Sequence, residues 1–348
     1  MAISKGYSDI AMMIRIWVYD GILAGGVAGC IDVFTAANRL SAKGVGADRK
    51  TFRKLIWSVE SLDGASVRSV SGQIIEVNRK IDARLRADAI LVTAPYVADM
   101  DEFIARRDQL EALTKAIRRQ HETGAILVSY CTGNYILAEA GLLNGRRATT
   151  HWAKAKDFAR RYPRVELRAD EILTEQDGIL CGGGVTSYSN LAIRLVDKLA
   201  GADLAAATAK TLLIDTNRVS QASYATLLEE HGHSDKLVAQ AQQRMEASLE
   251  QGFNLPNLAA HFAVSERTLN RRFKQATGFG PLEYLQTLRV EVAKRLLESG
   301  NLSVEGACLR VGYNDIGTFR MLFKRKTGLS PRDYQSRFMR IQPAQSDE

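Results

Sequence analysis

Apolar residues follow two different patterns along this chain, and the change comes near residue 201. Before it, short apolar runs alternate with longer segments whose apolar residues recur at helical spacing. This alternation predicts an α/β domain of the flavodoxin-like type: a parallel sheet with helices on both faces, and a ligand site at the carboxyl ends of the strands. The predicted strands are Ile14–Val18, Leu55–Val59, Ala89–Val92, Ile126–Ser129 and Ile179–Cys181, and the predicted helices are Ile31–Leu40, Glu102–His121, Tyr135–Leu142 and Leu191–Leu199.

The second pattern contains an internal repeat. Residues 265–284 (SERTLNRRFKQATGFGPLEY) align with residues 315–334 (DIGTFRMLFKRKTGLSPRDY) at a constant offset of fifty, and seven of the twenty aligned pairs are identical. Leu269 and Phe273 stand four residues apart in the first copy, as Phe319 and Phe323 do in the second, so each pair shares one helix face. We expect these four side chains to lie in the core, and the repeat to be one structural unit used twice.

The ends of both repeated helices are marked in the sequence. Ser265 and Asp315 are suitable N-caps, because their side-chain oxygens can accept hydrogen bonds from the first free backbone N–H groups. Gly278 and Gly328 suit the left-handed residue that follows a helix end. A shorter helix is predicted just before each copy, at 255–262 and 304–311, with a tight turn between the two helices. Helix, tight turn and basic helix form the helix-turn-helix pattern, so the C-terminal domain is predicted to be all-α with two such modules.

A single longer helix is predicted between the two copies. Pro281 suits its first position, and Ser299-Gly300 ends it. Its apolar residues at helical spacing are Leu285, Leu288, Val292 and Leu296. Such a helix would hold the two modules at a fixed separation, so that the two basic helices enter successive major-groove turns, roughly 34 Å apart, on one face of a duplex.

The charge distribution points to a polyanionic partner for this part of the chain. Each repeated helix carries four basic residues and one acidic residue, a surplus of three positive charges. Residues 235–340 hold 17 Lys and Arg against 10 Asp and Glu, so seven of the chain's eight net positive charges lie in under a third of its length. One basic helix is usually only a solvated surface. Two copies with matching caps and matching core residues favour a nucleic-acid interface.

Residues 234–338 resemble the DNA-binding domain of AraC/XylS-type transcription regulators, and VGYNDIGTFRMLFKRKTGLSP is the most specific part of the match. In the first copy Arg267, Asn270 and Arg271 point away from the core face and match positions where that family reads bases. Arg pairs with guanine and Asn with adenine. In the second copy the outward positions hold one polar candidate for base reading, Arg320. We therefore expect the first module to specify sequence and the second mainly to anchor; the predicted phosphate contacts are Arg272, Lys274, Lys324 and Arg325.

Composition limits the remaining possibilities. The chain has 348 residues and 46% apolar residues, enough for two or three ordinary domains. Its first dozen residues do not form a secretory signal, and Gly21–Ile31 is too short and too rich in glycine to span a bilayer, so we expect no membrane partner and a cytoplasmic location. The four cysteines are scattered without a CxxC pair or clustered histidines, which argues against a disulfide framework and a zinc site. We expect no metal and no cofactor. The predicted divisions are a tail (1–12), an α/β domain (13–201), a linker (202–233), the DNA-binding domain (234–340) and a tail (341–348).

A strand-turn-helix segment stands out in the α/β domain. The predicted strand Ile126–Ser129 leads into Cys131 and Gly133, after which a helix begins, and this is the shape of a nucleophile elbow. The segment ILVSYCTGNYILAEAGLLNGRRATTHW resembles the PfpI-like, class I glutamine amidotransferase-like superfamily, and the match extends over residues 13–201. Cys131 falls at that superfamily's nucleophile position, and His151 falls where many members keep a histidine near the cysteine.

The departures from this resemblance argue against catalysis. Enzymatic PfpI-like members have a histidine directly after the cysteine, where this chain has Thr132, and a glutamate from the loop after the first strand, where this chain has glycines and alanines. A thiol without an adjacent base lacks what makes a nucleophile productive. We expect no catalytic residue, and an effector pocket at the same place that involves Cys131, Thr132, His151 and Gly184. Alternative roles remain open: an inert packed thiol for Cys131, a capping or surface role for His151, and an ordinary strand end rather than an anion cradle for Gly182-Gly183-Gly184.

A PfpI-like domain followed by an AraC-type domain resembles the GlxA-type regulators. The resemblance implies that the first domain senses a small metabolite, with an amino acid or a quaternary amine as the first expectation, and that the second binds promoter DNA. It also implies a homodimer, and contact with RNA polymerase if the protein is an activator. Two rival classes stay open: a cysteine-dependent hydrolase or amidase with an incidental basic tail, and a structural DNA-binding protein without an effector.

Overall fold

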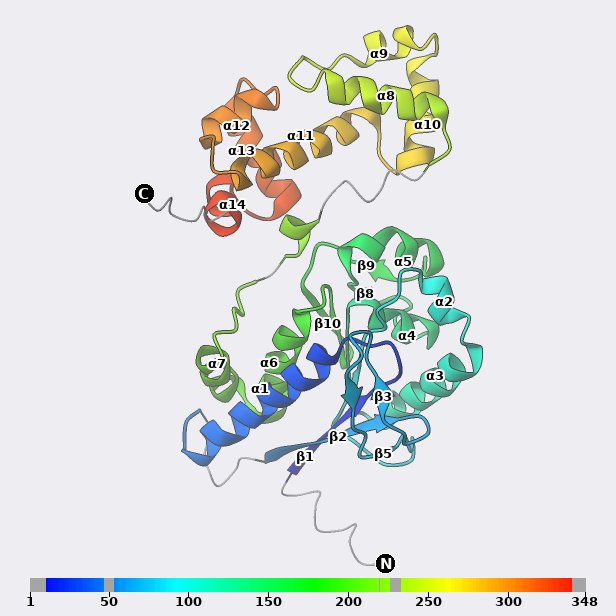
Figure 1. The fold of residues 1–348 in the computed structure, drawn as a ribbon, viewed down its shortest axis with the longest axis vertical. Helices are drawn as coiled ribbons and strands as arrows, with labels where there is room; N and C mark the ends of the chain where they lie inside the picture. The colour runs from blue at the N-terminus through cyan, green and yellow to red at the C-terminus, as the bar shows by residue number, and fades with distance from the viewer. Residues whose placement is uncertain (1–10, 47–52, 219, 226–232, 340–348) are drawn as a thin grey trace, which may run out of the picture. The chain divides into compact units, whose positions relative to one another are not determined.

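The structure is a computed structural model that describes residues 11–46, 53–218, 220–225 and 233–339 (Figure 1). Its contacts divide the chain into two compact units, residues 1–221 and 222–348. The predicted tails at 1–12 and 341–348 lie outside the described residues, apart from residues 11 and 12, which belong to the first strand. The predicted linker at 202–233 begins with helix α7 (Ala202–Thr211), whose buried residues pack on the first unit.

The first unit is built on a seven-stranded sheet in the order β10-β11-β7-β6-β1-β2-β5. Each of the five predicted strands is present, and the five run parallel to one another. The edge strand β10 pairs antiparallel with β11, and the sequence analysis did not predict it. The strands of the sheet are β1 (Ala11–Trp17), β2 (Lys54–Ser61), β5 (Arg79–Lys80), β6 (Ala89–Val92), β7 (Ile126–Tyr130), β10 (Leu173–Gln176) and β11 (Ile179–Gly182).

Helices cover both faces of this sheet, as the alternating pattern predicts. Helices α1 (Ala24–Ala42), α6 (Ser187–Ala200) and α7 pack together on one face, while α3 (Arg107–Glu122) and α4 (Asn134–Glu139) pack beside β7 on the other (Figure 1). The single helix predicted at Glu102–His121 is wrong. It is two helices, α2 (Met100–Ile104) and α3, because the chain leaves helical geometry at Arg106, where ψ is +60°.

Two glycines at the start of α1 allow this helix to pack closely on its neighbours. A Cβ atom on Gly26 would lie 1.9 Å from the Tyr130 hydroxyl oxygen, and one on Gly29 would lie 2.3 Å from the Tyr188 ring. Both positions therefore exclude larger residues. The glycine-rich stretch that replaces the expected glutamate thus holds α1 against the end of β7.

The second unit is all-α, with seven α-helices and one short 3-10 helix among its described residues. The predicted helix-turn-helix pairs are α9 (Leu255–His261) with α10 (Glu266–Thr277), and α12 (Val304–Arg310) with α13 (Ile316–Thr327). The predicted spacer helix is α11 (Pro281–Glu298), which begins at the expected proline. Helix α8 (Lys236–Ala247) precedes the first pair, and α14 (Pro331–Phe338) follows the second.

Each module has its own hydrophobic core, and the two cores share α11. Tyr284 and Leu285, near the start of α11, belong to the first core, while Val290, Ala293 and Leu297 belong to the second. The four apolar residues that the sequence places at helical spacing in this helix differ in burial. Leu285 is buried, but Leu288, Val292 and Leu296 are only half-buried. The helix packs against a different module at each of its ends, so its apolar residues do not form one straight stripe.

Arg289 joins the two modules at the middle of α11. Its side chain is 7% exposed, and its guanidinium donates to the backbone oxygen of Leu249 at 2.9 Å and to that of Gln251 at 2.7 Å, both in the loop after α8. The same guanidinium lies 5.0 Å from the centre of the Tyr313 ring in the second module. One buried cation therefore holds a loop of the first module and the turn of the second against a single helix.

Candidate functional site

The caps and cores predicted for the two repeated helices are confirmed. The Ser265 hydroxyl accepts from the Thr268 N–H at 3.2 Å, and the Asp315 carboxylate accepts from the Thr318 N–H at 2.6 Å. Both helices end on a left-handed glycine, Gly278 at φ +82° and Gly328 at φ +77°. The four predicted core side chains, Leu269, Phe273, Phe319 and Phe323, are fully buried. With the cores so placed, the opposite face of each helix turns its charged residues to solvent.

Most of the predicted DNA contacts lie on these outward faces. Arg267, Asn270, Arg271 and Lys274 of α10 are exposed, as are Arg320, Lys324 and Arg325 of α13. Arg320 lies 3.2 Å from the Glu305 carboxylate, in an ion pair whose two side chains are both more than half exposed. Met321, which stands where the first copy has Arg271, is 71% exposed. The outward face of α13 therefore offers an apolar group at the position where α10 offers a guanidinium.

Arg272 lies apart from this surface. Its guanidinium forms two hydrogen bonds, of 2.5 and 2.8 Å, with the carboxylate of Asp235, the N-cap residue of α8. Hydrogen bonding to Arg272 lowers the pKa of Asp235 to about 2, so the pair is ionised at neutral pH. The Arg272 side chain thus joins α8 to α10. The sequence analysis did not identify Asp235 as its partner, because 37 residues separate Arg272 from Asp235.

The nucleophile-elbow shape predicted around Cys131 is present. Strand β7 ends at Tyr130, Cys131 has a positive φ of +54°, and a short 3-10 helix leads into α4. Gly133 is required at this turn, since a Cβ atom there would lie 2.6 Å from the Ser129 hydroxyl oxygen. The strained backbone of Cys131 is the feature that places a nucleophile at the top of the sheet in proteins that use this turn.

The surroundings of Cys131 keep its thiol uncharged at neutral pH. The side chain is 5% exposed, and burial raises the pKa of the thiol to about 11, with Thr132 and Lys154 acting in the opposite direction. The Thr132 hydroxyl donates to the backbone oxygen of Pro95, and the Thr150 hydroxyl donates to the backbone oxygen of Cys131 at 3.0 Å. These bonds fix the loops around the cysteine. The other three cysteines, Cys30, Cys181 and Cys308, are free and buried in the cores.

His151 and the glycines that follow β11 have structural roles in this unit. His151 is an N-cap, because its Nδ1 atom accepts from the Ala153 N–H at 3.2 Å. Gly183 leaves room for the amide of Gln221, whose Nε2 atom would lie 2.4 Å from a Cβ atom at that position. The Gly184 backbone oxygen accepts from the Ser187 hydroxyl at 2.5 Å. No pattern in the sequence indicated that Gln221 would occupy this place.

Neither a cluster of metal ligands nor a helix suited to crossing a membrane is found in the part of the chain that the structure describes. Within residues 11–46, 53–218, 220–225 and 233–339, no three His, Cys, Asp or Glu side chains come together in a way that could hold a metal ion. Among the helices of these same ranges, none has both the length and the apolar composition that crossing a bilayer requires.

Comparison with known families assigns each unit. Residues 53–200 match the DJ-1/PfpI family, and residues 258–337 match a helix-turn-helix domain family. The chain is 30% identical over 223 residues to the HTH-type transcriptional regulator ArgR of Pseudomonas aeruginosa, covering 64% of this chain and 68% of ArgR. It is 26% identical over 216 residues to the HTH-type transcriptional regulator GlxA of Rhizobium meliloti, covering 62% of this chain and 66% of GlxA.

A solved structure supports the fold of the first unit. The crystal structure of a Vibrio parahaemolyticus protein described as a transcriptional regulator superposes with a TM-score of 0.50 at 17% identity, covering 58% of this chain and 99% of that one. The family matches, the ArgR relative and the two recognition helices agree with one another. The chain belongs to the AraC-type helix-turn-helix transcription regulators that carry a DJ-1/PfpI domain.

Proposed function

We propose that this transcription regulator binds promoter DNA in a sequence-specific manner, under the control of a small molecule held by its DJ-1/PfpI unit. The observation that carries the proposal is the pairing of two units in one chain. One presents two exposed basic helices on matched caps and cores, and the other keeps the elbow fold with a buried, uncharged thiol. An elbow fold that is retained without a reactive nucleophile suits binding better than turnover.

In this proposal the first module reads bases and the second mainly anchors. Arg267, Asn270 and Arg271 are the base-reading residues of α10, and Arg320 is the single polar candidate on α13. Lys274, Lys324 and Arg325 are exposed cations suited to phosphates. Arg272 is retained as a phosphate contact only through donors not used by Asp235, which makes it the weakest member of the set.

The effector is proposed to be a small nitrogenous metabolite, such as an amino acid or a quaternary amine. Cys131, Thr132, His151 and Gly184 are its candidate contacts near the elbow. We further propose that the regulator acts in the cytoplasm as a homodimer, and that it contacts RNA polymerase if it activates transcription. A structural DNA-binding protein without an effector is the rival on this point, and a ligand that raises the melting temperature of the full chain would exclude it.

The main alternative is a cysteine-dependent hydrolase or amidase. Against it stand the pKa of Cys131, raised to about 11, and the hydroxyl of Thr132, which donates to the Pro95 backbone oxygen at the position where a base would be needed. A thiol with that pKa is almost fully protonated at pH 7, and the thiolate is the nucleophilic form.

One variant separates the two functions. The full chain is first used to select DNA fragments from a genomic pool, and the affinity for the selected fragment is then compared between the wild type and Cys131→Ser. We expect equal affinities, with no esterase or amidase activity in either protein. Hydrolysis that disappears in Cys131→Ser would overturn the assignment as a non-enzymatic regulator, and failure of the wild type to select any sequence would overturn specific DNA binding.

A further inference from the structure

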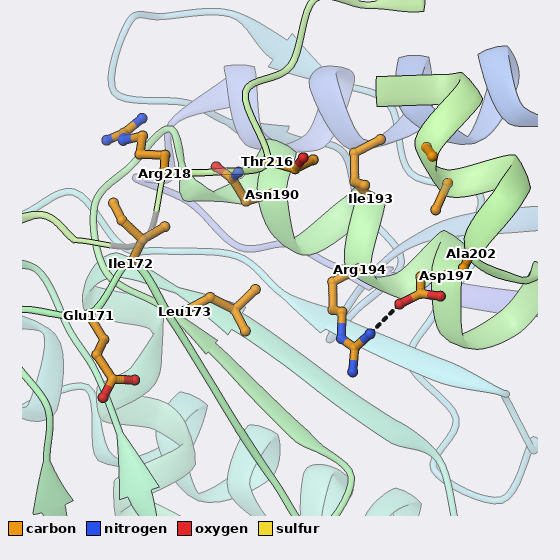
Figure 2. Close-up of a pocket in the computed structure, with 12 residues that line it drawn as sticks. Glu171, Ile172, Leu173, Asn190, Ile193, Arg194, Asp197, Ala202, Thr216 and Arg218 are labelled. Atoms are coloured by element: carbon orange, nitrogen blue, oxygen red, sulfur yellow. Dashed lines mark hydrogen bonds and ion pairs between the residues drawn. The ribbon is translucent and has the colours of Figure 1, made fainter. Parts of the chain in front are cut away.

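A cavity of about 550 Å³ opens in the first unit, away from the elbow residues considered above. It lies between the start of β10, helices α6 and α7, and the chain that follows α7 (Figure 2). Its size falls in the range of small-molecule sites. The lining residues are Glu171, Ile172, Leu173, Asn190, Ile193, Arg194, Asp197, Ala202, Ala205, Ala206, Thr216 and Arg218.

Half of this lining is apolar, and the charges of the other half balance. Arg194 forms ion pairs with Asp197 (Figure 2) and with Glu175, whose second oxygen binds Lys198. These four side chains form a closed neutral cluster beside the cavity. Glu171 and Arg218 add one charge of each sign at the side away from Ala202 (Figure 2). A lining without net charge favours a ligand that is itself net neutral, with an apolar body for the aliphatic wall and polar groups for the rim.

The chain that forms one wall of the cavity is anchored in the first unit by Gln221. Thr216 and Arg218 line the cavity, and Ser220 pairs with Glu171 in an isolated antiparallel bridge. The Gln221 side chain is 1% exposed, and its Nε2 atom donates to the backbone oxygens of Thr150 and Ala169, at 2.8 Å each. We call residues 216–218 and 220–225 the connecting segment.

The next residues of the connecting segment are anchored in the second unit. Ala222–Tyr224 form a 3-10 helix that packs against α13, and the Tyr224 ring lies 5.2 Å from that of Phe338 in α14. Lys294 of α11 is 3% exposed and donates from Nζ to the backbone oxygen of Ala225. Gln221 and Ala222 are consecutive, so a displacement of the cavity wall reaches the second module through covalently continuous residues.

We propose that this cavity binds a small, net-neutral amphiphile, and that the connecting segment transmits its occupancy to the second helix-turn-helix module. A ligand between α6, α7 and Thr216 contacts the connecting segment directly. A few residues further on, the same segment packs against α13. Coupling of this kind requires an element whose position both sites influence, and the connecting segment is that element. The proposal rests on the proposed function, since it adds to the elbow a second site, in a different part of the DJ-1/PfpI unit, through which a small molecule controls DNA binding.

The site is tested with three related probes and a filled cavity. Phenylalanine carries both charges and an apolar ring, 3-phenylpropanoate lacks the ammonium, and 2-phenylethylamine lacks the carboxylate. Ala206 is exposed and lines the cavity, so Ala206→Trp fills it from α7, whereas Lys210→Trp places the same indole on the same helix outside the lining. We expect phenylalanine to raise the melting temperature of the wild type and of Lys210→Trp more than either singly charged probe, and to leave Ala206→Trp unchanged.

The transmission is tested by DNA affinity in the same full-length proteins. With the fragment selected by the wild type, Ala206→Trp is expected to change the affinity by about five-fold or more, a typical allosteric coupling, while Lys210→Trp binds like the wild type. Adding Gln221→Ala to Ala206→Trp should abolish that difference, because the wall is then released from its anchor.

Three results would overturn the inference and leave the proposed function standing. Equal phenylalanine responses in Ala206→Trp and Lys210→Trp, or no response in the wild type, would refute the site. Unchanged DNA affinity in Ala206→Trp, with a wild type that binds its selected fragment, would refute the transmission. A wild type that selects no DNA sequence would instead count against the proposed function.

Discussion

The two helix-turn-helix modules agree in how they fold and differ in what they present. Each has a capped recognition helix ending on a left-handed glycine, and a core phenylalanine that packs edge-on against a tyrosine: Phe273 with Tyr284 at 5.6 Å, and Phe323 with Tyr334 at 5.4 Å. Their outward faces share a charge surplus but not the groups that would meet bases, since Arg271 corresponds to Met321. Folding thus fixes the inner half of each helix and leaves the outer half free for a separate role.

The largest effect that can test this comparison lies in the cores. Phe273→Ala and Phe323→Ala each remove a fully buried ring, and each is expected to cost about 3 to 5 kcal/mol of unfolding free energy. Chemical denaturation of the full chain measures it, with Met321→Ala, at an exposed site, as the control that changes stability by less than about 0.5 kcal/mol. If the unfolding free energies lost in Phe273→Ala and in Phe323→Ala differ by more than the width of that expected range, the two cores are not equivalent.

The two modules should differ in how much they contribute to the discrimination between bases. Arg271→Ala is expected to lose about 1 to 3 kcal/mol of discrimination between the selected fragment and a scrambled one, and Arg320→Ala clearly less. Lys324→Ala serves as the control, because loss of a phosphate contact weakens binding on both fragments alike and lowers its salt dependence. Binding assays on matched duplexes measure all three. If Arg320→Ala relaxed base preference more than Arg271→Ala, the order of the two modules would be reversed.

The caps differ in their response to acid. Hydrogen bonds from Thr318 lower the pKa of Asp315 below its ordinary value, whereas the Ser265 hydroxyl does not titrate in this range. The stabilisation from Asp315 is therefore fully present above its unfolded pKa, near 4, and is lost as pH falls through the lower folded pKa. Protection of the amides at the start of α13, measured against their intrinsic exchange rate at each pH, should fall in that window, and Asp315→Ser should remove this change. Equal acid responses in the wild type and Asp315→Ser would contradict the role of the carboxylate.

The smallest expected effect concerns the exposed ion pair of the second module. Arg320 and Glu305 are 3.2 Å apart and solvated, so Glu305→Gln should change stability by less than about 1 kcal/mol. It also releases Arg320, so DNA affinity should rise slightly, and more at low salt. Glu250→Gln, which breaks the exposed pair with Arg310 at 2.7 Å, is the matched control for a general loss of negative charge. An equal rise in both variants would show that Glu305 does not specifically restrain Arg320.

The sequence predicted what depends on neighbours along the chain. Ser265, Gly278 and Pro281 each act within one helical turn, and the elbow turn at Cys131 depends on a strand and a helix that are adjacent in sequence. Arg272, Arg289 and Gln221 could not be placed, because their partners lie about 40 to 70 residues away and depend on how the helices and loops pack. The cavity in Figure 2 could not be predicted for the same reason. Its walls come from β10, α6, α7 and the connecting segment, none of which carries a motif.

The sharing of α11 has a consequence for the length of the operator. Both cores and the Arg289 contacts bind the modules to one uninterrupted helix, so their spacing and relative rotation are set by the number of residues in that helix. Each inserted base pair turns one half of a DNA site by about 34 to 36° relative to the other, and a protein without a hinge between its modules has no means to follow. We therefore expect this regulator to require one fixed spacing between the two halves of its DNA site. Sites that are one base pair longer or shorter, with otherwise correct sequence, should not be bound.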